Sequence, residues 1–435
     1  MASYIYNIHK YENVNVISLW GENVLEKEFY FKSSRKGFYI KSENNDVSFY
    51  KNEEKLNFDV ADTSSGESFL EFKKIIQLEV SNIFNTKFDN IILLAGAGAS
   101  VVISNNKIDK NYGKTVKMIS EIAYNYFKNN SSSKIYTFEE LANKMHYPKV
   151  ISEDGIVLSE DFNLEDFLSK LISYSQFVIR GKNKYNNSIN ELLKIIKENT
   201  DYDYNSDVFK HGALLNILSR KVKSTSKLSI VTTNYDTLFE EAAESLNYTI
   251  FDGFTFQYNP RFSSDIFDWN IVKNIPNVKT NELVYYKKVF NLIKIHGSIN
   301  WKRAKNGYIY RKGKKEFINL EESVMIFPSA DKYAQTYQEP YFELFTKFQE
   351  LVRKPNSLLI TTGFSFSDNH ITKIITQAIT DNNSLTVLIS DFNISQQSEN
   401  WKKLERLMNE HYPVYFLKAT LNGDLTEYLG GKYEN

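Results

Sequence analysis

Short apolar runs alternate with helical patterns along most of the chain from residue 89 onward. Each run is continuous, as expected for a strand that is covered on both faces in a parallel sheet. Apolar residues at helical spacing follow several of the runs. The alternation predicts an α/β fold with a doubly wound, Rossmann-like parallel sheet. The predicted strands are Asn90–Gly96, Leu228–Asn234, Asn291–Gly297, Ser323–Ser329, Ser357–Phe364, Leu385–Phe392 and Val414–Ala419.

Two other stretches carry different patterns. Residues 1–85 alternate aromatic or β-branched residues with polar ones, then show helical spacing from Phe69 to Phe84. This pattern predicts a small β-rich N-terminal module with a linking helix, followed by a main domain over residues 86–435. Between about residues 113 and 223 helical spacing recurs without a strand pattern. We therefore expect a large helical insertion, packed over one end of the sheet.

The composition narrows the classes of function. Of the 435 residues, 42% are hydrophobic, and 53 Lys and Arg balance 53 Asp and Glu. A net charge of zero argues against binding to nucleic acid or membrane through bulk charge. The chain has no cysteine, which excludes disulfides, a thiolate nucleophile and a zinc site built on thiolates. Because no signal peptide or spanning segment is evident, we expect a cytoplasmic protein without membrane association.

Polar and small residues follow the predicted strands, where doubly wound sheets bind ligands. The first such segment is Gly96-Ala97-Gly98-Ala99-Ser100. Two glycines directly after a buried strand allow the backbone to approach a diphosphate, which the following amides can bind. The full dinucleotide fingerprint would place a third glycine at position 101, where Val101 stands. A tight turn between strand and helix would also explain the segment.

The second segment is Thr232-Thr233-Asn234-Tyr235-Asp236. The amide of Asn234 could orient a ribose hydroxyl or a water molecule, and the carboxylate of Asp236 could bind sugar hydroxyls. Asp236 could equally cap the helix that follows. These two roles do not exclude each other.

A histidine ends the third strand, in His296-Gly297-Ser298. Histidine is suited to proton transfer near neutral pH, although a single histidine is more often structural. The fourth segment, Gly363 to Asp368, combines a glycine, hydroxyls that include Ser365, and an N-cap candidate at Asp368. It could hold phosphates at a helix N-terminus. Asp391 ends the next strand and could reach an adenosine ribose.

Taken in order, these four segments resemble those of the sirtuin-like NAD-consuming family. The resemblance covers roughly residues 90–417. Two departures argue against protein deacylation: the four-cysteine zinc module is missing, and Val101 to Asn105 replaces the family's Gly-Ile-Pro-Asp-Phe-Arg segment. The chain is most similar to the bacterial subfamily that hydrolyses NAD in anti-phage defence, and within it to the member that pairs with a HerA-type ATPase. The segments that carry this similarity are Gly96–Ser100, Gly113–Lys117, Asn163–Leu168, Ile295–Trp301 and Gly363–Ile371.

This resemblance implies an enzyme, an NAD glycohydrolase that releases nicotinamide and ADP-ribose. His296 would act as the general base, Asn234 would orient the water and the ribose, and Asp236 would stabilise positive charge or hold ribose hydroxyls. NAD would be the substrate, and we expect no metal. Regulation by assembly follows from the family, with a homo-oligomer and a HerA-type hexameric ATPase as partners. The residues expected to bind NAD are Gly96, Ala97, Gly98, Ala99, Ser100, Thr233, Gly363, Ser365 and Asp391.

Other functions stay open at this point. A deacylase or ADP-ribosyltransferase is the enzymatic alternative. A sensor that binds NAD or ADP-ribose without turnover is a second, although it would not need a base at His296. The basic segment 302–315 has the pattern of a hairpin and could contact nucleic acid, although such hairpins are usually solvated surface.

Overall fold

The central feature is an 11-stranded sheet in the order β4-β3-β2-β1-β18-β17-β16-β5-β8-β12-β9. The strands from β18 to β9 pair in parallel, as the apolar runs predicted. The predicted α/β fold class is therefore confirmed. The parallel strands are β5 (Asn90–Ala95), β8 (Leu228–Thr232), β9 (Thr249–Phe251), β12 (Val289–Lys294), β16 (Ser357–Thr362), β17 (Leu385–Asp391) and β18 (Val414–Lys418). The computed structural model describes residues 27–43, 46–58, 65–104, 107–109, 111–130, 134–148, 150–151, 158–159, 162–223, 225–274, 283–313, 322–325 and 339–430.

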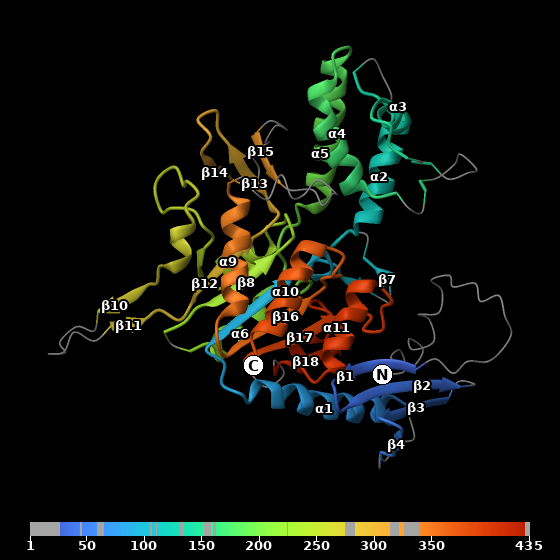
Figure 1. Ribbon diagram of the computed structural model, residues 1–435, viewed down its shortest axis with the longest axis vertical. Helices are drawn as coiled ribbons and strands as arrows, with labels where there is room; N and C mark the ends of the chain where they lie inside the picture. The colour runs from blue at the N-terminus through green and yellow to red at the C-terminus, as the bar shows by residue number, and fades with distance from the viewer. Residues whose placement is uncertain are drawn as a thin grey trace.

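Helices cover both faces of the parallel strands (Figure 1). Along β5, Ile92 and Leu94 face one helical layer, while Ile91 and Leu93 face the other. This alternation on a strand that is apolar throughout explains why the run is continuous. The first layer contains α9 (Tyr341–Arg353), α10 (Asn369–Asp381) and α11 (Glu399–Asn409), and the second contains α1 (Ser65–Phe84), α6 (His211–Lys221), α7 (Leu238–Ser245) and α12 (Leu425–Tyr428).

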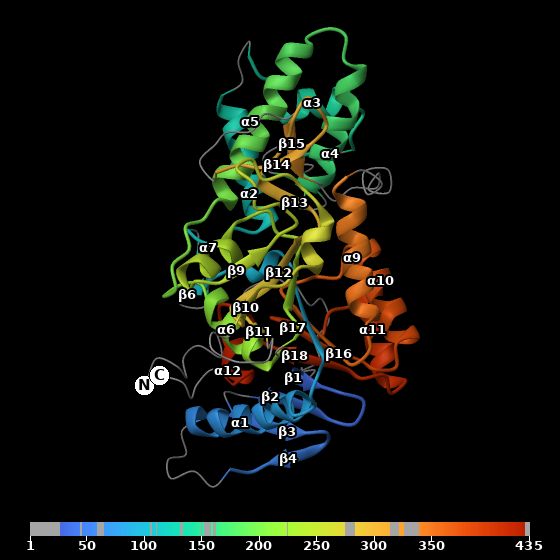
Figure 2. The same ribbon diagram turned by 90° about the vertical axis from the view of Figure 1, so that its left-hand side faces the viewer.

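The N-terminal strands extend the main sheet. Strand β1 pairs antiparallel with β18, with Phe31 opposite Leu417. Helix α1 packs beneath the same sheet, where Phe72 and Ile76 join the core of the second layer. The predicted strands and linking helix are present, and they lie at one end of the main sheet (Figure 2). Their buried side chains belong to the core of the second layer. The four strands are β1 (Lys27–Lys32), β2 (Gly37–Glu43), β3 (Asp46–Lys51) and β4 (Glu54–Leu56), and residues 1–26, 44–45 and 59–64 of this region lie outside the described residues.

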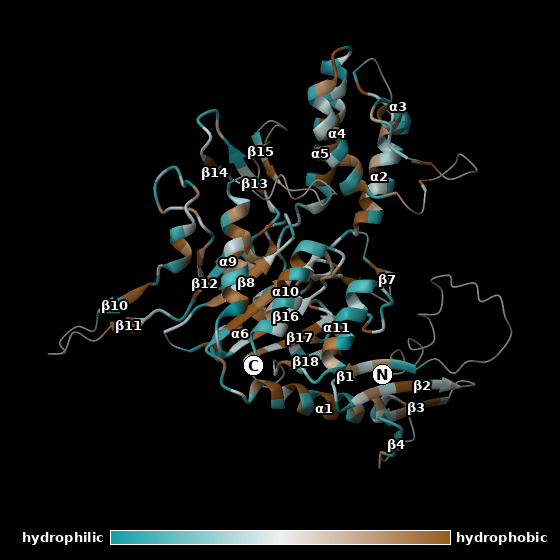
Figure 3. Cartoon of the chain, in the orientation of Figure 1, coloured by the Kyte–Doolittle hydropathy of each residue, from teal (hydrophilic) through white to brown (hydrophobic). Residues whose placement is uncertain are grey.

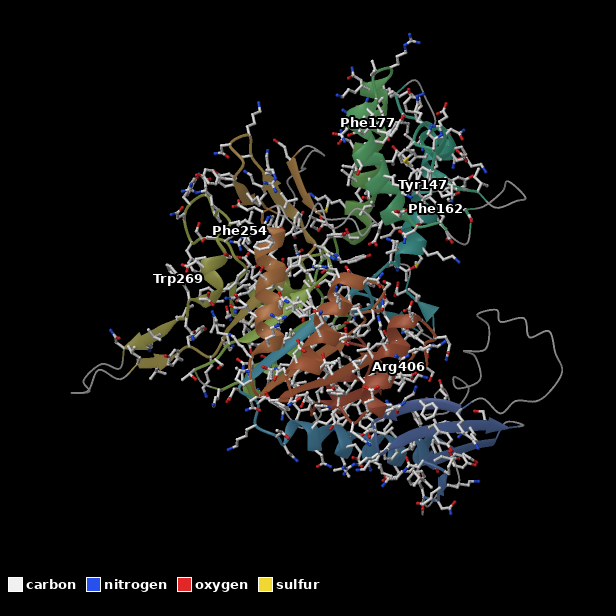
Figure 4. All side chains as sticks on the ribbon, in the orientation of Figure 1. Tyr147, Phe162, Phe177, Phe254, Trp269 and Arg406 are labelled. Atoms are coloured by element: carbon white, nitrogen blue, oxygen red, sulfur yellow. The ribbon has the colours of Figure 1, made fainter. Side chains whose placement is uncertain are left out.

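The helices of the predicted insertion form a core of their own, which Phe127, Phe138 and Phe167 share. They stand above one end of the sheet in Figure 1, and Tyr147 and Phe162 lie within this group in Figure 4. Helix α6 falls within the predicted range, yet it packs on the sheet through Leu214. The insertion helices are α2 (Val116–Asn129), α3 (Phe138–Lys144), α4 (Leu164–Tyr174) and α5 (Lys182–Thr200).

One predicted parallel strand is wrong. Ser323–Met325 forms β15, which pairs antiparallel with β13 (Gly297–Arg303) in a separate three-stranded sheet. The run is apolar because Val324 of β15 is buried in the core of the first helical layer. Residues 326–329 of that prediction lie outside the described residues. The predicted hairpin within 302–315 is present, since β13 pairs with β14 (Ile309–Arg311), although residues 314–315 are not described.

Two small ladders join β6 (Ile103–Ser104) to β7 (Lys107–Ile108), and β10 (Val272–Asn274) to β11 (Leu283–Tyr285). Hydrophobic residues gather on the central strands of the sheet (Figure 3). None of the helices in the described part of the chain combines the length and the apolar character that a bilayer crossing requires.

Candidate active site

The four candidate segments follow β5, β8, β12 and β16, so they meet at the carboxyl edge of the parallel strands. Strand order reverses between β5 and β16. After β5 the chain adds β8 and β12 on one side of it, and it later adds β16, β17 and β18 on the other side. A crevice at such a reversal is where open α/β sheets bind ligands. The segments at Gly96 and Gly363 lie on either side of this point.

The glycines of these two segments allow their backbones to touch. The N–H of Gly98 donates to the carbonyl of Gly363 at 2.9 Å, and the N–H of Gly96 donates to the carbonyl of Thr362 at 3.0 Å. A Cβ on Gly96 would lie 2.6 Å from the Gly363 oxygen, and Gly363 itself has a φ of +58°. Glycine is therefore required here by the contact between the two loops.

This packing changes the expectation for diphosphate binding. The N–H groups of Gly96, Gly98, Ala99, Ser100 and Gly363 all donate to carbonyls within the protein. Ala97–Ala99 forms a single 3₁₀ turn, and the next α-helix begins only at Val116. Contacts from these residues to a diphosphate stay a prediction. Because their backbone N–H groups already donate within the protein, fewer donors are left for a diphosphate than the sequence indicated. The hydroxyl of Ser365, which bonds that of Ser367 at 2.8 Å, lies at the exposed rim of the second loop.

A side-chain network joins the first segment to the second. The hydroxyl of Ser100 donates to Asp236 Oδ2 at 2.6 Å and accepts from Asn234 Nδ2 at 2.8 Å. Because the single proton of this hydroxyl points to the carboxylate, the atom of Asn234 that faces Ser100 must be the amide nitrogen. The amide oxygen of Asn234 is then the atom presented on the other side. Ser100 and Asp236 thus fix the orientation of the Asn234 amide.

Asp236 is engaged within the protein through both oxygens. Oδ1 accepts the N–H of Leu238, the first residue of α7, at 3.2 Å. The N-cap of α7 is Thr237, so Asp236 lies one residue before the cap position that the sequence predicted for it. Oδ2 accepts from Ser100. The predicted contact with ribose hydroxyls stays untested, and the geometry favours a positioning role for this carboxylate.

His296 pairs with a carboxylate that the sequence indicated only as a helix cap. Nε2 of His296 lies 3.2 Å from Asp368 Oδ2, and the histidine is only 4% exposed. Asp368 Oδ1 accepts the N–H groups of His370 and Ile371, which confirms the predicted N-cap of α10. Helix α10 therefore holds the carboxylate that orients the imidazole.

A buried lysine connects the second and third segments. Lys294, at the end of β12, is 1% exposed. Its ammonium donates to the carbonyls of Tyr235 and Asp236, and it pairs with Glu240 Oε1 at 2.9 Å. The Tyr235 carbonyl also accepts from the hydroxyl of Ser298 at 3.2 Å. The turn that presents Asn234 is thus fixed to the segment that presents His296.

Residues 228–411 match the family model of the SIR2-like domain. This part of the chain is similar to SIR2-like domains. Domains of this family bind NAD, which suggests an NAD-related function, and the match supports the resemblance to sirtuin-like proteins over these residues. The match begins at β8 and includes the segments at Asn234, His296 and Gly363, while the segment at Gly96 precedes it. No curated protein matches the chain significantly.

Three residues that position the site of the SIR2-like domain were not found from the sequence. Asp368 was noted only as a cap, because its contact with His296 joins residues 72 positions apart. Asn422 donates to the carbonyls of Ala99 and Val101 from a late loop, with no sequence signal. Lys294 did carry a signal, since it is the one charged residue in the apolar run Asn291–Gly297 apart from the candidate histidine.

Replacing Lys294 by Met is expected to destabilise the fold by about 3 kcal/mol, because it leaves the carboxylate of Glu240 without its ammonium. Burial raises the pKa of Glu240, an effect that Lys294 opposes. The additional change Glu240→Met should restore most of the stability measured by urea unfolding. Any NAD-dependent activity should stay low in the double variant, because the carbonyls of Tyr235 and Asp236 still lack their donor. Recovery of both the stability and the activity in the double variant would refute the positioning role of Lys294.

At the end of β17, burial makes the ionised form of Asp391 less favourable. The carboxylate is buried, and burial raises its pKa to about 6, although the N–H of Asn393 and the amide of Gln396 oppose the shift. These bonds lie within its own turn, and none of them reaches the network of Ser100 or His296. Donor hydroxyls from a ribose would stabilise the ionised form, as the predicted adenosine contact requires.

The variant Asp391→Asn is expected to stabilise the chain above pH 6. Since the pKa is raised in the folded state, the stability linked to the protonated carboxyl is complete below about pH 4 and is lost as the pH rises to about 6. The advantage of Asn over Asp should therefore grow across this window to about 2–3 kcal/mol. Urea unfolding at pH 4 and pH 8 measures it. An equal effect at both values would contradict the raised pKa.

Proposed function

We propose that the chain is an NAD glycohydrolase that cleaves the bond between nicotinamide and ribose. The observation that supports this most is the presence of two side-chain networks at the carboxyl edge of the sheet. One orients the Asn234 amide through Ser100 and Asp236, and the other orients the His296 imidazole through Asp368. A site that only binds NAD has no need of an oriented base in addition to an oriented amide.

The reaction needs few groups. The glycosidic bond breaks with its electron pair on nicotinamide, which leaves as a neutral base, while water bonds to the ribose carbon. His296 takes the proton that the water loses, and the carboxylate of Asp368 stabilises the resulting imidazolium. Asn234 holds the water or a ribose hydroxyl through its amide oxygen. The products are nicotinamide, ADP-ribose and one proton.

Binding of the rest of NAD is assigned to the two loops on either side of the strand-order reversal. Ala97, Thr233 and Ser365 lie on the turns that follow three adjacent strands, β5, β8 and β16. Asp391 follows the next strand, β17, and so would hold the adenosine ribose farther along the same edge. The Gly96 and Gly363 loops set the distance between these groups through their backbone contact.

Depletion of NAD in anti-phage defence, with a homo-oligomer and a HerA-type hexameric ATPase as partners, is the biological role that we propose. The similarity of segments such as Asn163–Leu168 and Ile295–Trp301 to that subfamily supports it. The helical insertion is a candidate for control of the site, because Tyr235, next to Asn234, packs against the insertion core.

Product analysis in heavy-oxygen water tests the reaction type. A hydrolase should place one heavy oxygen on ADP-ribose for each nicotinamide released. Release that depends on an added acylated peptide, or ADP-ribose attached to a protein, would instead show a deacylase or a transferase. Binding of NAD without any release would show a sensor.

A further inference from the structure

A polar cavity of about 190 Å³ lies at the opposite edge of the sheet from the candidate active site. It is formed where β5 and β8 begin, beside Asn291 of β12 and the C-terminal end of α9. The segment that contains Phe267 and Asp268 closes one side, close to Trp269, which Figure 4 labels. Because the strands are parallel, their amino ends are separated from the Asn234 and His296 networks by the length of the sheet.

Positive charge predominates in the lining of this cavity. Lys227, Lys347 and Lys354 line it, and Asp268 is the one acidic residue among the described lining residues. Lys347 pairs with Asp268 at 2.6 Å, while the ammonium of Lys227 donates to the carbonyls of Phe267 and Trp269. Lys347 also pairs at 3.4 Å with Glu350, which lies outside the lining. Carbonyls are neutral, so within the lining one carboxylate faces three ammonium groups.

The lysines act on one another electrostatically. The pKa of Lys227 falls to about 8, first because of burial and further because Lys347 and Lys354 are near, while Asp268 opposes the shift. An anion placed among the three groups would remove this repulsion. The charge balance therefore favours occupation by an anion.

A buried polar atom in the lining also lacks a partner. Asn291 is 5% exposed, and its Nδ2 donates to the Phe267 carbonyl at 3.2 Å. Its Oδ1 accepts no hydrogen bond within the structure. A buried acceptor without a donor costs about 1–3 kcal/mol. Because Oδ1 has almost no accessible surface, a ligand hydroxyl beside the anionic group would supply that donor once the Asn291 side chain rotates toward the cavity.

We infer that this cavity binds a small phosphate ester with free hydroxyl groups, in which the phosphate lies among Lys227, Lys347 and Lys354 and a hydroxyl donates to Asn291. The site is independent of the proposed NAD chemistry. Its ligand would bind at the amino edge of β5 and β8, the same strands whose carboxyl ends carry Gly96 and Asn234.

Calorimetric titration of the full chain with ribose 5-phosphate, AMP and inorganic phosphate tests the inference. The charge reversal Lys354→Glu changes an exposed lysine of the lining, and Lys402→Glu is the matched control on the exposed side of α11. We expect saturable binding of ribose 5-phosphate that weakens about tenfold or more in Lys354→Glu and is unchanged in Lys402→Glu. Asn234→Ala should bind it like the wild type, which separates this cavity from the NAD site.

Four results would overturn the inference. The first is no saturable binding of any of these probes to the wild-type chain. The second is an equal loss of affinity in Lys354→Glu and Lys402→Glu, which would indicate a general charge effect. The third is binding that disappears in Asn234→Ala, which would place the ligand at the candidate active site. The fourth is inorganic phosphate that binds as tightly as either ester, which would refute the hydroxyl contact with Asn291. Comparison of ribose 5-phosphate with AMP shows whether the ester is a sugar phosphate or a nucleotide.

Discussion

Replacing His296 by Ala is expected to lower the rate of nicotinamide release by about 10²–10⁴-fold, the usual contribution of a positioned general base. The imidazole is almost fully buried beyond the end of β12 and is held by Asp368. Bulk water is therefore not expected to replace it as the proton acceptor. Asn234→Ala is expected to be at least as damaging, because it removes the amide that Ser100 orients. Nicotinamide release measured at saturating NAD gives both values.

A histidine outside the site provides the control for this experiment. His146 is exposed at the end of α3 and has a φ of +52°, which Asn tolerates better than other residues. His146→Asn should therefore keep both the fold and the rate. Retained turnover in His296→Ala and Asn234→Ala, with folding confirmed by circular dichroism, would remove both residues from the catalytic role.

The variant Gly363→Ala is expected to destabilise the chain by about 4 kcal/mol or more, a size reserved for severe structural conflicts. A Cβ at this position would lie 2.3 Å from the Ala99 nitrogen and 2.3 Å from the Gly98 carbonyl carbon. Those atoms belong to a loop that Asn422 and Gly113 also contact, so the loop cannot move aside. The free energy of unfolding in urea measures the effect.

Gly307→Ala is the matched control for Gly363. Gly307 also has a positive φ, +84°, but a Cβ there would meet nothing within 4 Å. Its replacement should cost only about 1–2 kcal/mol, the penalty of the left-handed conformation alone. Equal losses at the two positions would show that backbone conformation, and not the contact between the two loops, requires Gly363.

The parallel strands could be predicted because burial on both faces leaves a direct mark on the sequence. Leu228–Thr232 and Ser357–Thr362 are buried throughout, and each appears as a continuous apolar run. The place of the N-terminal strands could not be predicted. Their alternating pattern suits any sheet with one open face, and the pairing of Phe31 with Leu417 joins distant parts of the chain. The run at Val324 was assigned to the wrong sheet for a related reason, since a short buried strand looks alike in either sheet.

The parts of the candidate site that lie at the ends of strands could be predicted from the sequence. Asn234 and His296 follow adjacent strands, β8 and β12, and therefore lie at one edge of the sheet. The partners that orient them depend on the path of the loops. Asp368 reaches His296 after a turn in which Phe366 has a φ of +57°, a conformation that no residue pattern indicated.

Nicotinamide release from NAD by the purified chain, alone and with a HerA-type ATPase, tests the central claim most directly when Asn234→Ala is measured beside it. The account predicts release by the wild-type chain, alone or once the partner is added, and none by the variant in either condition. Release only with the ATPase would show that the partner controls the site. NAD that stays bound and intact in both conditions would contradict the claim that this edge of the sheet is a hydrolytic site.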